Sequence, residues 1–242
     1  MSLLRPIHIS FDALAGVDGS ARFSFGDTSS SLASVSGPIA ARLAAEHPSR
    51  STVEVHVRPL SSVPGTTEKR LSTSLKGIIE RACVLSQNPR TLIQVVVQAL
   101  SSRSTSALVA SEINACSLAL VNAGSIPMRG VVCAVAVGRR RVGDEVGLVL
   151  DPLDESKING GGCFAFLFGV TREGVQSNIP PSKMIWTDYR AGVGESIDAR
   201  EITQATELAR KGAADVWVEI KKSLGGFSVI DEDEDSDTSM ET

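Results

Sequence analysis

The stretch DGSARFSFGDTSSSLASVSG (residues 18–37) contains two runs with a period of two, separated by a polar turn. From Ala21 to Phe25 apolar and polar side chains alternate, and Gly26-Asp27 then supplies residues that favour a tight bend. A serine-rich run follows and leads to Gly37-Pro38, a pair that we expect to end the strand. The stretch therefore predicts a β-hairpin with one face on a core, and we assign it no catalytic group.

The hydrophobic period separates strands from helices along the rest of the chain. Strands are predicted at 53–57, 90–100, 131–138, 145–150 and 163–170, and helices at 66–83, 104–124 and 198–223. The helix at 104–124 is apolar on nearly every side and ends at Gly124, so we expect it to be buried and capped there. No long linker or repeat divides the first 230 residues. The pattern predicts one α+β domain.

Composition limits the classes of protein that the chain can represent. Of 242 residues, 42% are hydrophobic but only 4% are aromatic, so the core must be built mainly from aliphatic side chains. No run approaches the roughly 18 apolar residues of a membrane-spanning helix, and the N-terminus does not resemble a secretion signal. The four cysteines form no CxxC pair, and we interpret them as reduced, mostly buried thiols of an intracellular protein.

The charge of the chain is concentrated at its C-terminus. The last twelve residues, DEDEDSDTSMET, contain seven acids and no base, and they are too polar to fold. Because the formal net charge is −4, the rest of the chain carries +3 without them. We therefore predict a folded domain over 1–225 and a disordered acidic tail over 226–242. A mildly basic domain is compatible with RNA binding but does not establish it.

Motifs of nucleotide-binding and catalytic sites are missing or incomplete. The segment AGVGES (191–196) lacks the third glycine and the preceding strand of a dinucleotide loop, and no P-loop is present. The histidines are isolated, so no metal is predicted. The segment 150–163 contains three acids, Asp151, Asp154 and Glu155, which could bind Mg²⁺ or act as a general acid. Because Lys157 is nearby, a polar loop between strands is the simpler interpretation, and no cofactor is predicted.

Arginines provide the candidate nucleic-acid contacts. Arg139, Arg140 and Arg141 follow a predicted strand, where we expect a hairpin turn that could hold a phosphate backbone. Such a run is more often a solvated turn or a docking point for a protein partner. Arg50 lies just after Pro48 in a second exposed loop. Aromatic residues are not interleaved with these arginines, so we do not expect base stacking.

Several segments together resemble the RNase PH family. They are DGSARFSFGDTSSSLASVSGPI, EHPSRSTVEVHVRP, TTEKRLSTSLKGII and ASEINACSLALVNAG. The variant forms ASVSGPI and VEVHVRP look most like the ring subunits of the eukaryotic RNA exosome, of the ribosomal RNA-processing protein 46 type. The resemblance covers roughly residues 15–222. It implies an RNase PH-like (ribosomal protein S5 domain 2-like) fold, a two-layer α+β domain of sheet and helix.

The active members of this family are phosphorolytic 3′→5′ exoribonucleases. Their chemistry needs a glycine turn and an arginine that hold the attacking phosphate, together with two carboxylates. The resemblance places the phosphate turn at Ser104, Thr105, Ser106 and Ala107, with no glycine and with Ala107 at the arginine position. It places one acid at Glu155 and the other within the glycines 160–162. Each missing group is worth about 2–4 kcal/mol, so the resemblance implies a degenerate phosphate site and no catalytic residue.

The resemblance also implies partners. Family members form a six-membered ring, and this chain would line its channel and guide RNA for rRNA processing and RNA decay. The partners would be other RNase PH-like ring subunits (a protein-43-type neighbour among them), S1/KH cap subunits and RNA, in the nucleus, the nucleolus and the cytoplasm. Arg50 matches a pore loop and is the first RNA-contact candidate.

Two other functions stay open at this point. The first is an active phosphorolytic nuclease that uses Arg103 with Asp151, Asp154 and Glu155 in a shifted arrangement. The second is a free-standing RNA- or DNA-binding protein that acts outside any ring.

Overall fold

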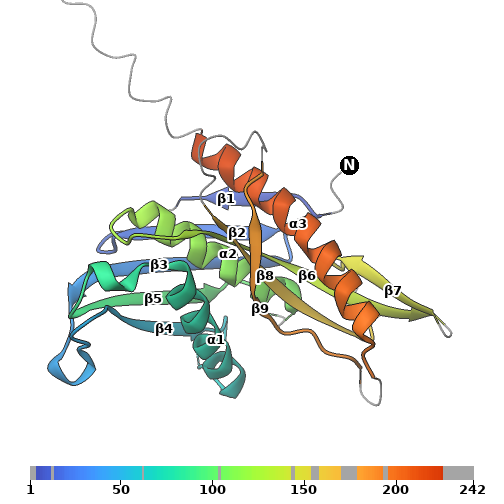
Figure 1. Cartoon of the computed structure of the whole chain (residues 1–242), viewed down its shortest axis with the longest axis horizontal. Coiled ribbons are helices and arrows are strands. Elements are labelled where there is room, and N and C mark those ends of the chain that lie inside the picture. The colour runs from blue at the N-terminus through green and yellow to red at the C-terminus, as the bar shows by residue number, and fades with distance from the viewer. Residues whose placement is uncertain are drawn as a thin grey trace, which may run out of the picture.

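The first five strands form one sheet (Figure 1). The computed structural model describes residues 4–11, 14–61, 63–102, 105–142, 145–153, 158–169, 179–192 and 196–225. The spatial order in the first sheet is β1 (Ile7–Ser10), β2 (Gly19–Phe25), β3 (Ser29–Ala40), β5 (Thr91–Ala99) and β4 (Thr52–Arg58). Neighbouring strands are antiparallel except β4 and β5, which are parallel and are connected through helix α1 (Thr66–Ala82).

The predicted hairpin is present, but its second strand is longer than expected. Strands β2 and β3 are antiparallel, and their pairing begins with Phe25 opposite Ser29 and continues to Gly19 opposite Val35. Gly26-Asp27 lies in the turn between them. The prediction that Gly37-Pro38 ends the strand is wrong. After a register irregularity between Ser36 and Ile39, β3 resumes pairing with β5 and ends at Ala40. The Gly37-Pro38 peptide bond is cis.

The remaining strands form a second, antiparallel sheet. Its order is β7 (Glu145–Leu150), β6 (Gly130–Val142), β8 (Gly160–Gly169) and β9 (Ser182–Thr187). Strand β6 runs further than predicted, so the three arginines lie within a strand and not in a hairpin turn. The extension is held by partners on both sides, because Arg139 pairs with Leu148 of β7 and with Gly160 of β8. Strands β1 and β9 were not predicted.

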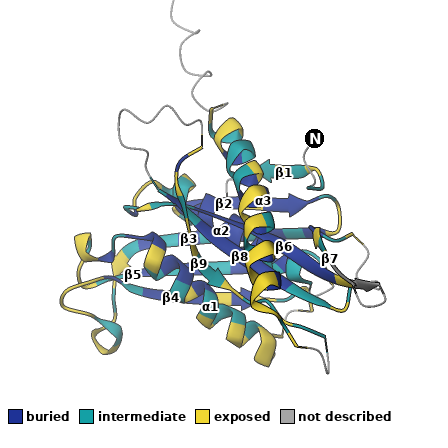
Figure 2. Ribbon diagram, turned by 45° about the vertical axis from the view of Figure 1, so that its right-hand side comes forward, coloured by how far each residue is buried: buried dark blue, intermediate teal, exposed yellow. Residues whose placement is uncertain are grey.

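Helix α2 (Ser106–Ala123) lies between the two sheets and contacts both (Figure 1). Its approach to β2 is close, because a Cβ atom on Gly19 would lie 2.4 Å from the carbonyl oxygen of Ala119. By length and composition α2 is apolar enough to cross a membrane, yet 72% of it is buried inside the protein. Figure 2 shows this buried centre. The predicted burial of this helix and its cap at Gly124, which has a φ of 62°, are confirmed.

Helix α3 (Ala199–Gly225) covers the outer face of the second sheet, where it packs mainly on β6 and β8. The layers thus run from the first sheet through α2 to the second sheet and α3, with α1 beside β4. The predicted α+β class is confirmed. The four cysteines are buried and free, as predicted for buried thiols. The predicted acidic tail at 226–242 lies outside the described residues.

Candidate functional site

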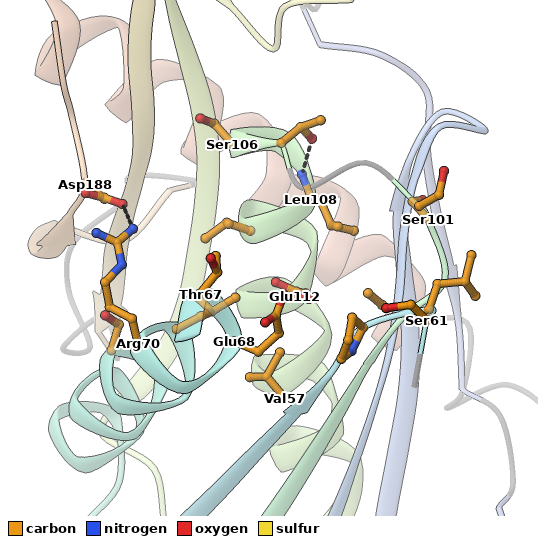
Figure 3. Close-up of a pocket in the computed structure, with 18 of the residues that line it drawn as sticks. Val57, Ser61, Thr67, Glu68, Arg70, Ser101, Ser106, Leu108, Glu112 and Asp188 are labelled. Carbon is orange, nitrogen blue, oxygen red and sulfur yellow. Dashed lines mark hydrogen bonds and ion pairs between the residues drawn. The ribbon is translucent and has the colours of Figure 1, made fainter. Parts of the chain in front are cut away.

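A pocket of about 520 Å³ opens where the ends of β4 and β5 meet the starts of α1 and α2 (Figure 3). Trp186 of β9 and Asp188, which follows that strand, line it from the second sheet. The other lining residues are Val57, Pro59, Leu60, Ser61, Thr67, Glu68, Arg70, Leu71, Ser74, Ala99, Ser101, Ser102, Thr105, Ser106, Leu108, Val109 and Glu112. The pocket therefore joins segments that are far apart in the sequence.

The predicted phosphate turn lies partly in this pocket. Thr105 and Ser106 line it, and Thr105 caps α2 by accepting a hydrogen bond from the Leu108 amide at 3.0 Å. Ala107, which the resemblance places at the arginine position, is buried and is not among the lining residues of the pocket. Arg103 and Ser104 lie outside the described residues.

The side of α2 that faces the pocket carries an acid that was not predicted as a site residue. Glu112 is only 2% exposed, and its carboxyl group has no hydrogen-bond partner within the described part of the chain. Burial, and to a smaller degree the nearby Glu68, raises the pKa of Glu112 from 4.5 to about 8. Glu112 is the only acid in a helix that is otherwise apolar on nearly every side. That isolation is the signal from which it could have been found.

The other charged groups of the pocket already have partners. Arg70, the one basic side chain among the lining residues, donates to Asp188 at 3.0 Å. Asp188 also accepts from Arg190 at 2.8 Å, and Glu68 accepts from the Gly65 amide at 2.7 Å. Within the described residues, no group of three or more His, Cys, Asp or Glu side chains could hold a metal ion. The pocket is acidic, because three carboxyl groups face a single arginine.

The glycines 160–162, where the resemblance places the second acid, leave no room for a side chain. A Cβ atom would lie 2.6 Å from Arg190 O at Gly160, 2.4 Å from Val137 O at Gly161 and 2.0 Å from Asp188 O at Gly162. These contacts are with backbone, so a carboxylate side chain would need the strands to move apart.

The acids of the segment 150–163 do not meet in the pocket as far as the structure describes them. Asp151 is buried and forms an ion pair with Arg5 at 2.5 Å, and it is not a lining residue. Asp154 and Glu155 lie outside the described residues.

The structure contradicts the prediction that Arg139 contacts RNA. Arg139 is 3% exposed, and its Nε donates to Glu201 of α3 at 2.7 Å. The Tyr189 hydroxyl donates to the same carboxylate oxygen at 2.7 Å. Arg139 therefore anchors α3 to the second sheet. Arg140 is exposed, and the side chain of Arg141 lies outside what the structure describes.

Arg50 is exposed at the other end of the first sheet from the pocket. It lies just before β4, whereas the pocket lies beyond the end of this strand. Two hydrogen bonds connect its loop to the one before β5, from the Arg90 amide to His47 O at 3.1 Å and from the Ala41 amide to Arg90 O at 3.4 Å.

These hydrogen bonds bring Arg42, Arg50 and Arg90 to one end of the sheet, and all three are exposed. We call this group the basic loop cluster. One acid, Glu46, lies 3.3 Å from Arg90 within it. Neither Arg42 nor Arg90 was predicted as a site residue, because the connection between the loops is visible only in the fold.

The same arrangement of sheets and helices occurs in known structures. The crystal structure of rice (Oryza sativa) Rrp46 superimposes with a TM-score of 0.74 at 25% sequence identity, and it covers 92% of this chain and 95% of that one. The fold therefore places the chain in the RNase PH-like class, as the sequence predicted.

Sequence comparison gives the family. The model of the 3′ exoribonuclease family, domain 1 (RNase_PH), matches residues 3–125. An exosome complex exonuclease RRP46 homologue from Oryza sativa subsp. japonica is 33% identical over 181 residues, which cover 74% of this chain and 73% of that protein. The exosome complex component rrp46 of Schizosaccharomyces pombe is 39% identical over 122 residues, half of this chain and 53% of that protein. The chain belongs to the RNase PH family of 3′ exoribonucleases, and its similarity is to the Rrp46 type.

Proposed function

We propose that this chain is a non-catalytic structural subunit of the RNase PH-like ring of an RNA exosome, where it lines the channel that guides RNA to 3′→5′ processing and decay. The acidic character of its pocket is the observation that carries this proposal. The partners are other RNase PH-like ring subunits (a protein-43-type neighbour among them), S1/KH cap subunits and RNA. The proposed locations are the nucleus, the nucleolus and the cytoplasm.

Phosphorolysis requires that an inorganic phosphate oxygen attack the terminal phosphodiester while the 3′ oxygen of the preceding nucleotide leaves. Negative charge accumulates between the reacting groups, so an active site supplies cations and amide donors to it. Here the Leu108 amide at the start of α2 already bonds to Thr105, and Arg70 is paired with Asp188. Glu68 adds negative potential to the same pocket, and Glu112, whose pKa is raised to about 8, supplies no positive charge there. Among the described lining residues, this arrangement offers a phosphate dianion no unpaired cation.

The basic loop cluster is the proposed RNA contact of the chain. Exposed arginines bind the phosphate backbone without reading the bases, which suits a channel through which many RNAs pass. Arg50, Arg42 and Arg90 provide three such charges against one acid, Glu46. Arg140 is a second exposed candidate, on the second sheet.

A second candidate function is an active phosphate-dependent 3′→5′ exoribonuclease. The name of the rice relative, which contains the word exonuclease, favours it. Such an enzyme would depend on Arg103, Asp154 and Glu155, all outside the described residues. It would also have to hold phosphate beside Glu112.

The ring and the RNA contact are tested by reconstitution. We expect co-expression with candidate ring subunits to give one complex that contains this chain in a fixed ratio, as measured by native mass spectrometry. In that complex, replacement of Arg42, Arg50 and Arg90 by Gln should reduce the slope of log affinity for single-stranded RNA against log salt by about 2, at 0.7 per lost contact.

A matched variant removes the same charge from α3 by replacing Arg200, Lys211 and Lys222, which are also exposed, with Gln. It should leave the slope unchanged. An equal loss in both variants would contradict the assignment to the basic loop cluster. A chain that stays a monomer or homo-oligomer with every partner would contradict the ring.

A further inference from the structure

Glu112 is a buried acid for which the protein itself supplies no partner. Its carboxyl group lies on the side of α2 that faces the pocket, near Glu68 and Val57 (Figure 3). Only 2% of the residue is exposed, and no described residue donates a hydrogen bond to it. Burying a polar group without a partner costs free energy, and such a group in a native structure calls for an explanation. A ligand that brings its own donor would satisfy Glu112.

The charges around Glu112 determine which ligand fits. Glu68 and Arg70 line the pocket from α1, and Asp188 lines it from the segment after β9. Arg70 and Asp188 neutralise each other, so Glu68 and an ionised Glu112 leave the pocket negative. Burial raises the pKa of two thiols, Cys116 on the same helix and Cys163 on β8, and the nearby Glu112 raises the pKa of each further. An anion is therefore repelled, and a donor that carries a positive charge is favoured over a neutral donor.

The rest of the wall is largely hydrocarbon. The apolar lining residues are Val57, Pro59, Leu60, Leu71, Ala99, Leu108, Val109 and Trp186. Such a wall suits an aliphatic stem, and the face of an indole ring attracts a cation. A volume of about 520 Å³ is also in the usual range of small-molecule sites, roughly 300–1,000 Å³. The pocket can therefore hold an ion of several heavy atoms.

We propose that this pocket binds an organic ammonium ion, a protonated amine on an aliphatic stem, with Glu112 as its counter-charge. The stem packs against the apolar wall, and the ammonium group donates to the buried carboxylate. The hydroxyl groups of Ser74 and Ser106 also line the pocket and can accept its remaining hydrogens. The site occupies the pocket whose acidic character supports the proposed function, but amine binding itself requires neither RNA nor a contact between ring subunits.

Binding should be linked to a proton. Burial and Glu68 raise the pKa of Glu112 to about 8, so most of this group is protonated at pH 7 in the free protein. The ammonium ion binds the ionised form, and the Glu112 proton therefore leaves for the solvent when the ligand enters. The affinity should rise about tenfold from pH 7 to pH 9 and fall again above about pH 10, where the amine loses its own proton as a lysine side chain does. The other charged groups that line the pocket are Glu68, which accepts from the Gly65 amide, and Arg70, which donates to Asp188.

Calorimetric titration of the full chain tests the proposal. The probes are butylammonium and spermidine, with butanol as the uncharged control and inorganic phosphate as the anion. We expect both amines to bind about tenfold more tightly at pH 9 than at pH 7, with proton release visible as a heat that depends on the buffer. Glu112→Gln should weaken both amines at least tenfold and remove the pH dependence, whereas Glu207→Gln, an exposed acid on α3, should change neither.

Several results would overturn the proposal. They are butanol binding as tightly as butylammonium, phosphate displacing the amine, an affinity that does not depend on pH, or unchanged binding by Glu112→Gln. Proton release is measured on the unmodified chain. The proposal can therefore be tested even if the Glu112→Gln variant does not fold. Because none of these measurements uses RNA or a ring partner, a simple loss of amine binding would leave the proposed function standing. Displacement of the amine by phosphate would instead count against the acidic pocket on which the proposed function rests.

Discussion

Arg139 and Arg140 are adjacent in β6 but have opposite surroundings. Arg139 is buried against Glu201, whereas Arg140 is exposed. Arg139→Ala leaves the Glu201 carboxylate buried without its cation, and we expect it to lower the free energy of unfolding by about 3–5 kcal/mol. Arg140→Ala should change this free energy by no more than about 0.5 kcal/mol. Urea denaturation of both variants measures the difference, and equal effects would contradict the role of Arg139 as an anchor of α3.

The raised pKa of Glu112 predicts how stability depends on pH. The folded chain holds the Glu112 proton up to a pKa of about 8, whereas the unfolded chain loses it near 4.5. The folded state therefore binds more protons between these values, and the contribution of Glu112 to stability falls as the pH rises through this window. The slope is up to about 1.4 kcal/mol per pH unit. Glu112→Gln removes this loss, because its amide does not ionise.

The measurement is the difference in unfolding free energy between Glu112→Gln and the unmodified chain at pH 5, 6.5 and 8. We expect a difference near zero at pH 5 that grows in favour of the variant by a few kcal/mol at pH 8. Glu207→Gln, at an exposed position, should follow the unmodified chain at each pH. A difference that stays constant with pH would show that the Glu112 pKa is not raised.

At the scale of elements, the contact between α2 and β2 depends on a missing side chain. A methyl group on Gly19 would lie 2.4–2.7 Å from the backbone of Ala119 and Ala123, so Gly19→Ala must push the helix off the sheet. We expect a loss of about 1–3 kcal/mol, typical of overpacking. Gly77, in the middle of α1, has open space at the same point, and Gly77→Ala should stabilise by about 0.5–1 kcal/mol. Thermal unfolding distinguishes the two variants: we expect Gly19→Ala to lower the melting temperature and Gly77→Ala to raise it.

Most elements could be predicted from the sequence because their periodicity matches their burial. The alternation in β4, where Val53, Val55 and Val57 are buried, and the apolar surface of α2 reflect contacts with a core that each element faces along its whole length. The short strands β1 and β9 were missed because none of their residues is fully buried. β1 alternates half-buried and exposed positions over only four residues, and β9 does not alternate. Backbone pairing with β2 and β8 holds them, and this pairing leaves no pattern in the sequence.

The site was harder to predict than the fold. Thr105 and Ser106 line the pocket at the start of α2, and the start of a buried helix is recognisable in a sequence. The burial of Arg139 could not be predicted from the sequence, because its partner Glu201 is 62 residues away. Asp188 and Arg70 are 118 residues apart and meet only in the folded chain. Charge pairs of this kind follow from tertiary packing and not from local pattern.

At the scale of the whole molecule, two charged surfaces lie at opposite ends of the parallel strands β4 and β5. The basic loop cluster lies where these strands begin, and the acidic pocket lies where they end. A strand of seven residues spans roughly 23 Å, so an RNA phosphate held at the cluster is remote from the pocket. The proposed function therefore assigns RNA contact to one surface and no phosphate chemistry to the other.

The most direct test is an assay of the purified chain with a labelled oligoribonucleotide, inorganic phosphate and Mg²⁺. The acidic pocket predicts no release of nucleoside diphosphate above the control without phosphate. Phosphate-dependent release at an ordinary enzymic rate of about 1 s⁻¹ or faster, lost in the Arg103→Ala or Glu155→Ala variant, would contradict the account.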